Sequence, residues 1–264
     1  MRDAMSAQPT TLLEVHGLGC RFGGLQAVAD FDFSVATGEI KAVIGPNGAG
    51  KTTLFNMISG AIAPSSGRIL LGGHDIVALP PFVRARRGIA RTFQNLQIFK
   101  DMTVIENVMV GRHTRSCCGT VQALLRSRAS RREERDIRAA SLALLERLGL
   151  AARADEPAAA LSFGDCKLLE IARALAAAPL LLLLDEPAAG LAHDAAERVG
   201  ALIRELNRGG LTVLLVEHNM RLVMNLSHRI VVLDHGRKIA EGSPDEVRRD
   251  PAVLAAYLGE DEDA

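Results

Sequence analysis

In the N-terminal part of this 264-residue chain, residues 45–52 read Gly45-Pro46-Asn47-Gly48-Ala49-Gly50-Lys51-Thr52. This octapeptide matches the pattern GxxxxGK[ST], and the chemistry of phosphate binding explains the order of its residues. Glycines let backbone N–H groups wrap a phosphate where a Cβ atom would collide, and a following helix directs its positive end at the same anion. Lys51 can then reach the β- and γ-phosphates, and the Thr52 hydroxyl can hold Mg²⁺. The pattern predicts a phosphate loop, and we expect these eight residues and Thr53 to bind a nucleotide.

The segments on both sides of this loop have the composition that it requires. Residues 40–44 are typical of a buried strand, and residues 54–59 are typical of a helix. Further short β-rich segments occur at residues 12–16, 31–35 and 68–71. Because strand, glycine loop and helix follow one another in this order, the sequence predicts an α/β fold.

A pair of acidic residues follows a second buried segment. Residues 180–184 are five consecutive leucines, typical of a strand covered on both faces, and they run directly into Asp185 and Glu186. An aspartate at the strand end can orient Mg²⁺, and the adjacent glutamate can act as general base on the attacking water. His218 follows another expected strand, the apolar residues 212–216, and we expect it on the ligand-binding side of the sheet.

The composition argues against nucleic acid as a partner. Lysine plus arginine and aspartate plus glutamate are equal at 31 residues each, so no basic field attracts a polyanion. Aromatic residues make up only 3% of the chain, which leaves few surfaces for stacking bases.

The chain also lacks the features of a secreted or membrane-spanning protein. We expect residues 1–10 to form a flexible leader without a secretory signal. The longest apolar segment, residues 174–184, is about half of the roughly 20 residues that a spanning helix needs. The four cysteines have no zinc-site spacing and are expected to be reduced thiols: Cys20, Cys117, Cys118 and Cys166.

The middle of the chain differs in character from its two ends. The β signals fade between residues 95 and 160, and residues 137–148 have apolar residues at helical spacing. The sequence therefore predicts a nucleotide-binding core, a helical subdomain inserted in it, and a C-terminal helix and tail. The expected ranges are 11–94 and 161–243 for the core, 95–160 for the helical subdomain with an adjoining helix over 162–178, and 244–264 for the C-terminal part. Within the core we expect a helix over 195–207 and a strand over 230–233.

Five short motifs occur in an order that resembles ABC ATPases. They are the phosphate loop, Gln94 in Arg91-Thr92-Phe93-Gln94, the tetrapeptide Leu161-Ser162-Phe163-Gly164, Asp185-Glu186, and His218. The tetrapeptide resembles the LSGGQ signature that separates ABC proteins from other P-loop ATPases. The resemblance implies a P-loop NTPase (RecA-like) core with an antiparallel β part and an inserted helical subdomain, acting on ATP with Mg²⁺.

The resemblance also implies a role for each motif residue. Phe22 would stack on adenine, and Gln94 would link Mg²⁺ and the attacking water to the membrane contact. Mg²⁺ would be held by Thr52, Gln94 and Asp185. Glu186, His218 and Gln94 would be the catalytic residues. The signature residues Ser162, Phe163, Gly164 and Asp165 would meet the γ-phosphate bound by a second ABC ATPase subunit, so that each site is completed by a dimer.

A closer resemblance is to the ATPase subunits of branched-chain amino-acid importers. It rests on residues 21–25, 91–94, 102–108, 169–175 and the tail Ala256-Tyr257-Leu258-Gly259-Glu260. It implies integral-membrane permease partners and, indirectly, a periplasmic solute-binding protein. The ATPase would be cytoplasmic and peripheral on the inner face of the membrane, in a homodimer or a heterodimer.

Three other functions remain open at this point. They are the ATPase of a lipid or lipopolysaccharide exporter, a soluble ABC protein of DNA repair or translation, and an ATP-binding regulatory module. A single phosphate loop and signature, without a long heptad region, count against the second, and the presence of Lys51 and Glu186 counts against the third.

The sequence departs from the family pattern at three places. Phe163 replaces a glycine, and Asp165-Cys166 replaces the usual Gln-Gln pair, which adds negative charge near the opposing phosphate site. Ala192 stands where the family has Asp or Asn, and it can make no side-chain hydrogen bond across a dimer. We expect weaker or uneven coupling of the two sites as a result.

Overall fold

The computed structural model describes residues 10–94, 96–112 and 128–258. The chain forms two compact units: unit 1 comprises Met1–Pro81 and Ile203–Ala264, and unit 2 comprises Phe82–Leu202. Helix α7 (His193–Arg208) contains the second of the two boundaries between the units, which lies between Leu202 and Ile203.

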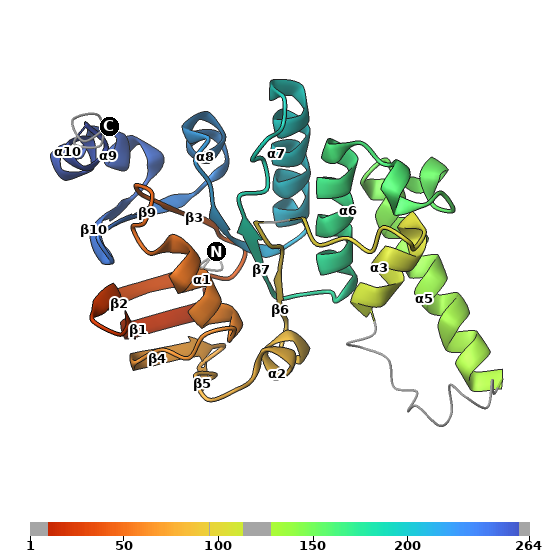
Figure 1. Ribbon diagram of the computed structural model, residues 1–264, viewed down its shortest axis with the longest axis horizontal. Coiled ribbons are helices and arrows are strands. Elements are labelled where there is room, and N and C mark those ends of the chain that lie inside the picture. Colours follow the sequence, from red (N-terminus) through yellow and green to blue (C-terminus); the bar gives the residue numbers. More distant parts are fainter. Residues whose placement is uncertain (1–9, 95, 113–127, 259–264) are drawn as a thin grey trace, which may run out of the picture. The chain divides into compact units, whose positions relative to one another are not determined.

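Unit 1 contains two sheets with helices beside them (Figure 1). Its strands are β1 (Thr11–Phe22), β2 (Leu25–Ala36), β3 (Ile40–Ile44), β4 (Ser66–Leu71), β5 (His74–Asp75), β8 (Thr212–Val216), β9 (Arg229–Asp234) and β10 (Arg237–Gly242). Its helices are α1 (Lys51–Ser59), α8 (Met220–Leu226), α9 (Pro244–Arg249) and α10 (Pro251–Leu258).

Strand β3 is the centre of the sheet that carries the phosphate loop. It pairs in parallel with β8 on one side and with β9 on the other, and β10 pairs antiparallel with β9. Every residue of β3 and β8 is buried, as expected for strands of a parallel sheet that is covered on both faces. The strands predicted over residues 40–44 and 212–216 are confirmed with these bounds, and the one predicted over 230–233 lies within β9.

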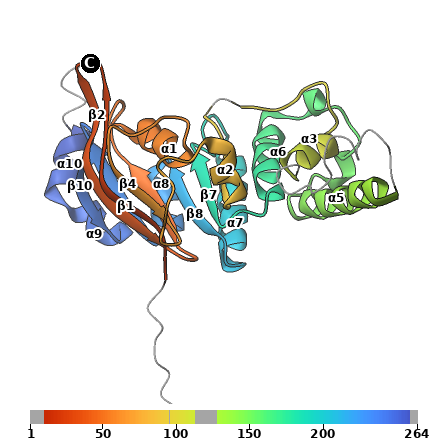
Figure 2. The same cartoon turned by 90° about the horizontal axis from the view of Figure 1, so that it is seen from below.

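The second sheet of unit 1 is antiparallel, in the order β2-β1-β4-β5. Figure 2 shows β1 and β2 as two long strands side by side. Apolar side chains of β2 alternate toward the core, where the rings of Phe31 and Phe33 pack with their centroids 5.4 Å apart. The predicted segments 12–16, 31–35 and 68–71 are parts of β1, β2 and β4.

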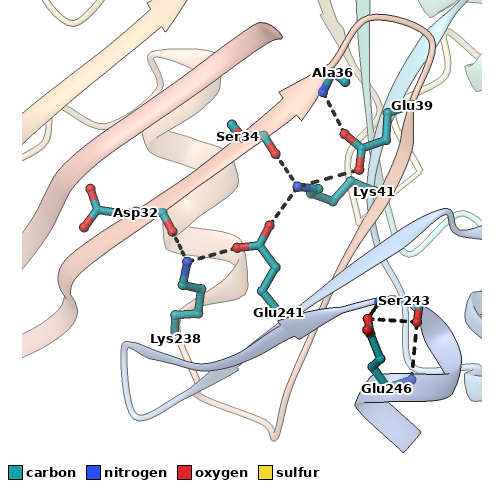
Figure 3. A network of polar contacts seen from close by, with 9 residues as sticks. All are labelled: Asp32, Ser34, Ala36, Glu39, Lys41, Lys238, Glu241, Ser243 and Glu246. Carbon is teal, nitrogen blue, oxygen red and sulfur yellow. Dashed lines mark hydrogen bonds and ion pairs between the residues drawn. The ribbon is translucent and has the colours of Figure 1, made fainter. Parts of the chain in front are cut away.

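A buried lysine joins these two sheets (Figure 3). Lys41 in β3 is buried, and its ammonium donates hydrogen bonds to the Ser34 carbonyl oxygen of β2 and, at 2.9 Å, to the Glu241 carboxylate of β10. It also forms an ion pair with Glu39 at 3.6 Å. Lys238 bonds the same Glu241 at 2.9 Å. Burial acts to raise the pKa of Glu241, but the hydrogen bonds from the two lysines outweigh it, so this pKa lies below its usual value.

The Glu241→Gln variant is expected to be less stable by about 1–3 kcal/mol at neutral pH, because it leaves a buried ammonium without its closest carboxylate. Since the folded-state pKa of Glu241 is lowered, its contribution is present above the unfolded-state pKa and is lost as pH falls through the folded-state pKa. Urea unfolding of wild type and variant at neutral and acidic pH measures this, and the difference should shrink at acidic pH. A difference that stays constant with pH would contradict the ionic explanation.

Unit 2 holds a parallel strand pair and a group of helices. Its elements are α2 (Pro81–Arg86, beginning at the unit boundary), β6 (Ile89–Arg91), α3 (Val104–Arg112), α5 (Arg128–Arg147), η2 (Ala151–Arg153), η3 (Ala158–Ala160), α6 (Phe163–Ala176) and β7 (Leu181–Asp185). β6 pairs with β7, and α3, α5 and α6 pack together through buried side chains such as Val108, Leu145 and Leu169 (Figure 1).

The helix expected over 137–148 lies within α5 except for its last residue. The predicted subdomain limits, residues 95 and 160, differ from the limits of unit 2 and stay a prediction.

Two expected elements differ from the structure. The strand expected from residue 180 begins at Leu181. Leu180 is 56% exposed and precedes β7, and its N–H donates a hydrogen bond to the Gly88 carbonyl oxygen at 2.8 Å. The single C-terminal helix expected from residue 244 is interrupted at Asp250. A proline disfavours helical geometry in the residue before it, so Pro251 ends α9 and begins α10.

The structure bears on the expectations about membrane spans and cysteines only within the part of the chain that it describes. None of the helices within it combines the length and the apolar composition that crossing a bilayer requires. Cys20 and Cys166 are buried free thiols, and burial raises the pKa of both, which disfavours the reactive thiolate. Cys117, Cys118 and most of the predicted leader lie outside the described residues.

Candidate nucleotide site

The phosphate loop connects β3 to α1 in unit 1 and has a backbone that glycine permits. Gly45, Gly48 and Gly50 have φ values of 150°, 77° and 106°. A Cβ atom at Gly45 would lie 1.9 Å from the Leu233 carbonyl oxygen, and one at Gly50 would lie 2.5 Å from the Ala27 carbonyl oxygen. The loop therefore needs glycine both for its conformation and for its close approach to neighbouring strands.

Helix α1 begins directly after this loop. Its N-cap is Gly50, which has no side chain to cap the first N–H groups of the helix. Lys51 is only 7% exposed, and its ammonium donates hydrogen bonds to the carbonyl oxygens of Gly45 at 2.6 Å and Pro46 at 2.7 Å. Thr52 is exposed and Thr53 is partly exposed in the first turn. This end of α1 presents a cation, hydroxyl groups and a positive helix terminus together, as anion binding requires.

The end of β7 in unit 2 carries a buried carboxylate. Asp185 is 2% exposed, and one oxygen bonds the Arg91 guanidinium at 2.8 Å. Its backbone N–H donates to the Thr92 hydroxyl at 3.2 Å, which attaches β7 to the residue that follows β6. Among the described residues its other oxygen, Oδ1, has no hydrogen-bond partner. A buried anionic oxygen without a protein partner is suited to a cation or an ordered water.

The next residue, Glu186, combines an unusual backbone with a specific contact. Its φ of 49° lies in the left-handed region, which costs a non-glycine residue on the order of 1–3 kcal/mol. Its Oε2 atom accepts a hydrogen bond from the Gln94 side-chain amide at 3.2 Å. Unit 2 thus brings together two residues that the sequence places 92 positions apart.

His218 lies in unit 1, just after β8, and is exposed. Its backbone N–H and that of Asn219 both donate to the buried carboxylate of Glu217, at 3.0 and 3.2 Å. Asn219 caps α8 by accepting a hydrogen bond from the N–H of Leu222. Glu217 therefore fixes the turn that presents His218 at the end of the strand.

The tetrapeptide that resembles a signature stands at the N-terminus of α6. The helix begins at Phe163, and Ser162 is its N-cap, one residue later than the predicted start. The Ser162 hydroxyl donates to the Asp165 carboxylate at 2.8 Å and accepts from the Asp165 N–H at 3.2 Å. Arg153 lies 3.4 Å from the same carboxylate, so a cation partly compensates the negative charge that Asp165 adds.

Two further signature residues contact the loop after Glu186. A Cβ atom added at Gly190, whose φ is 74°, would lie 3.2 Å from the Phe163 ring. One added at Gly164 would lie 3.8 Å from the Leu191 side chain. The aromatic ring that replaces the family's glycine therefore fits against a glycine of this loop. Ala192 is exposed at the end of the loop, and its predicted effect on coupling stays a prediction.

Phe22 ends β1 in unit 1. It is 48% exposed beside the turn at Gly23, so it is not a core residue. An exposed ring at this position can stack on a planar group.

Sequence reasoning missed several side chains that hold the predicted residues. They are Arg91 at Asp185, Arg153 at Asp165, Glu217 at His218 and Glu170 at the Phe93 backbone. For Glu170 and Glu217 the sequence offered a signal, because an acidic residue within an apolar segment must find partners when it is buried.

The comparison with known proteins adds to this geometry. Residues 28–189, more than half of the chain, match the family model described as ABC transporter. This chain belongs to the ABC transporter family. Residues 237–263 of the ABC ATPase match a second model, described as branched-chain amino acid ATP-binding cassette transporter. The predicted resemblance and fold class are confirmed, and the chain is an ATP-hydrolysing subunit.

Curated relatives and solved structures agree with the family. The ABC ATPase is 44% identical over 250 residues to the high-affinity branched-chain amino acid transport ATP-binding protein LivG of Escherichia coli (strain K12). This match covers 94% of this chain and 98% of that protein. It is 36% identical over 249 residues to the lipopolysaccharide export system ATP-binding protein LptB of Acidithiobacillus ferridurans, covering 94% and 97%. The crystal structure of the ADP conformation of MJ1267, an ATP-binding cassette of an ABC transporter, superposes with a TM-score of 0.83 at 34% identity, covering 94% and 99%.

Proposed function

We propose that this ABC ATPase energises the import of branched-chain or related hydrophobic amino acids through separate permease chains. The observation that carries the proposal is the C-terminal match over residues 237–263, a region that lies outside the general ABC match. The higher identity to LivG than to LptB supports the same direction.

ATP and Mg²⁺ are the ligands that fit the site residues. The nine residues from Gly45 to Thr53 bind the phosphates, with Lys51 on the β- and γ-phosphates, and Phe22 stacks on adenine. Mg²⁺ typically takes one or two protein ligands and fills its coordination with substrate phosphates and water. The Thr52 hydroxyl, the free Oδ1 of Asp185 and the Gln94 amide oxygen suit that role. When bound, Mg²⁺ neutralises charge that develops on the phosphates.

Three side chains act on the attacking water. Glu186 accepts its proton as general base, and the Gln94 amide, 3.2 Å from Glu186, orients that carboxylate and the water. His218 donates a hydrogen bond to the γ-phosphate or to the water. The strained Glu186 backbone supports this assignment, because residues in disfavoured conformations concentrate at active sites.

A second ABC ATPase subunit completes each site. Ser162, Phe163, Gly164 and Asp165 at the start of α6 meet the γ-phosphate held by the partner, in a homodimer or a heterodimer. The exposure of Ser162 and Phe163 supports this role. Hydrolysis removes the shared phosphate contact and lets the two subunits separate.

The permease contact lies on residues 94–112 of unit 2. Phe99 and Met102 are exposed apolar side chains on this segment, and exposed apolar patches mark partner surfaces. The subunit therefore sits peripherally on the inner face of the membrane. A periplasmic solute-binding protein delivers the substrate to the permeases.

Uptake by cells tests the transported substrate. A strain that lacks this gene is expected to regain uptake of labelled leucine, isoleucine and valine with the wild-type gene but not with Glu186→Gln, which should leave less than about a tenth of the initial rate. Proline uptake serves as the control and should not change. If the strain that lacks this gene takes up leucine at the normal rate and retains lipopolysaccharide at its inner membrane, the subunit belongs to an exporter instead.

A further inference from the structure

A buried carboxylate on α6 holds the segment that carries Gln94. Glu170 lies in the middle of this helix and is 2% exposed. Its Oε1 atom accepts a hydrogen bond from the backbone N–H of Phe93 at 3.1 Å. The backbone N–H of Gln97 also faces this carboxylate and acts to lower its pKa. These two donors lie on either side of Gln94, so a single side chain fixes the backbone around it.

Two cationic side chains flank Glu170 and oppose the effect of its burial. Burial has the largest effect on Glu170 and raises its pKa above the usual value. The Phe93 N–H opposes this effect, as do Lys167 and Arg173, which lie one turn before and after Glu170 on the same helix. The Arg173 guanidinium also lies 5.4 Å from the centre of the Phe99 ring, further along the same segment. An acid is almost never fully buried unless it is paired, and here the backbone donors and the two cations supply the pairing.

The far end of the segment is attached to α3. Asn107 accepts a hydrogen bond from the Phe99 N–H at 2.9 Å and donates to the carbonyl oxygens of Phe99 at 2.9 Å and Thr103 at 3.0 Å. The backbone around Gln94 is therefore held by α6 at Phe93 and by α3 at Phe99. Gln94 is the residue of this segment whose side chain reaches Glu186.

We propose that Glu170 is a positioning residue that holds Gln94 against Glu186, and that it thereby makes the Gln94 segment move with the signature helix. The start of α6 carries Ser162, and Glu170 is two turns further along the same rigid helix. A displacement of the segment by a permease is transmitted to α6 through Glu170. The proposal rests on the catalytic roles of Gln94 and Glu186 in the proposed function.

Amide exchange of the full-length chain tests the contact itself. Glu170→Ala removes the acceptor, so the amides of Phe93 and Gln97 are expected to exchange with deuterium at least about tenfold faster. Glu170→Gln keeps a neutral acceptor, which bonds less strongly, and about threefold faster exchange is expected. Unchanged exchange at both amides in the glutamine variant would overturn the proposal, and this result does not depend on whether the ATPase assignment is right.

A double-mutant cycle tests the consequence for hydrolysis. Glu170→Ala is expected to lower kcat about tenfold and to leave KM for ATP within about twofold, because loosened positioning slows the reaction without removing a phosphate contact. In a Gln94→Ala background the same substitution should lower kcat less than about twofold, since the residue that it positions is gone. Glu170→Gln should restore most of kcat. If the alanine variant does not fold, the exchange rate of the Phe93 amide in the glutamine variant decides the proposal.

A neighbouring substitution provides the matched control. Leu169→Ala creates a cavity in the same turn of α6, and it should lower thermal stability without changing the Phe93 amide. Effects of Glu170→Ala and Gln94→Ala that multiply would overturn the positioning role. If Gln94→Ala alone leaves kcat unchanged, the catalytic role of Gln94 fails, and the positioning proposal fails with it even where the exchange data confirm the contact.

Discussion

The Glu186→Gln variant is expected to hydrolyse ATP about 10²–10³ times more slowly than the wild type while binding ATP with similar affinity. The substitution keeps the size of the side chain and can still pair with the Gln94 amide, 3.2 Å away in the wild type. It removes the carboxylate that takes the proton from water. Because this proton transfer occurs only in the transition state, kcat falls and nucleotide affinity does not. Phosphate release by the purified full-length chain measures kcat, and gel filtration with ATP should detect accumulated dimers.

A matched substitution separates this effect from a general loss of charge. Glu197 is exposed on α7, 3.2 Å from His193, and Glu197→Gln should leave kcat within about twofold of wild type. Turnover at the wild-type rate in Glu186→Gln would remove this residue from the base role.

The parts of the site that follow from local chemistry could be predicted from the sequence. The glycines, Lys51 and Thr52 lie within eight consecutive residues, and β3 before them is mostly apolar, so composition and order alone indicate the phosphate loop. The same holds for Asp185 and Glu186 at the end of β7. The residue-level roles of these side chains remain proposals.

The contacts that hold these residues could not be predicted. Arg91 meets Asp185 across 94 positions of sequence, and Glu170 meets Phe93 across 77. No periodicity or motif marks such pairs, because they depend on which strand lies beside which and on which helix covers them. The break at Asp250 has a local signal in Pro251, because a proline disfavours helical geometry in the residue before it.

Asp165 shows how a structural contact changes the interpretation of a sequence departure. Its negative charge stands near the expected γ-phosphate contact, where it would repel a phosphate, although the first turn of a helix favours an acidic residue. The carboxylate is bonded to the Ser162 hydroxyl and lies 3.4 Å from Arg153. Its charge is therefore shared with a cation of the same unit, which weakens the repulsion expected for a bound phosphate.

The Lys51→Ala variant is expected to bind ATP about 10–100 times more weakly than the wild type. Hydrogen bonds to charged groups contribute about 1.5–3 kcal/mol, and each 1.4 kcal/mol corresponds to a factor of about ten in affinity. In the structure the Lys51 ammonium bonds the carbonyl oxygens of Gly45 and Pro46 at 2.6 and 2.7 Å, so it stands inside the loop that wraps the phosphates. Isothermal titration of the full-length chain with ATP and Mg²⁺ measures the change in Kd.

Loss of the lysine also removes partners from two loop carbonyl oxygens, so reduced binding has to be separated from a disordered loop. Lys51→Arg keeps the cation but not its shape, and it should bind ATP more tightly than Lys51→Ala while remaining below wild type. Lys238→Ala removes an exposed ammonium from the same unit, where it pairs with Glu241, and should leave ATP affinity within about twofold. Since phosphate charge is what Lys51 recognises, adenosine should bind wild type and Lys51→Ala equally. An ATP affinity that Lys51→Ala leaves unchanged would show that the loop binds its ligand without this cation, and the phosphate assignment of residues 45–53 would then be wrong.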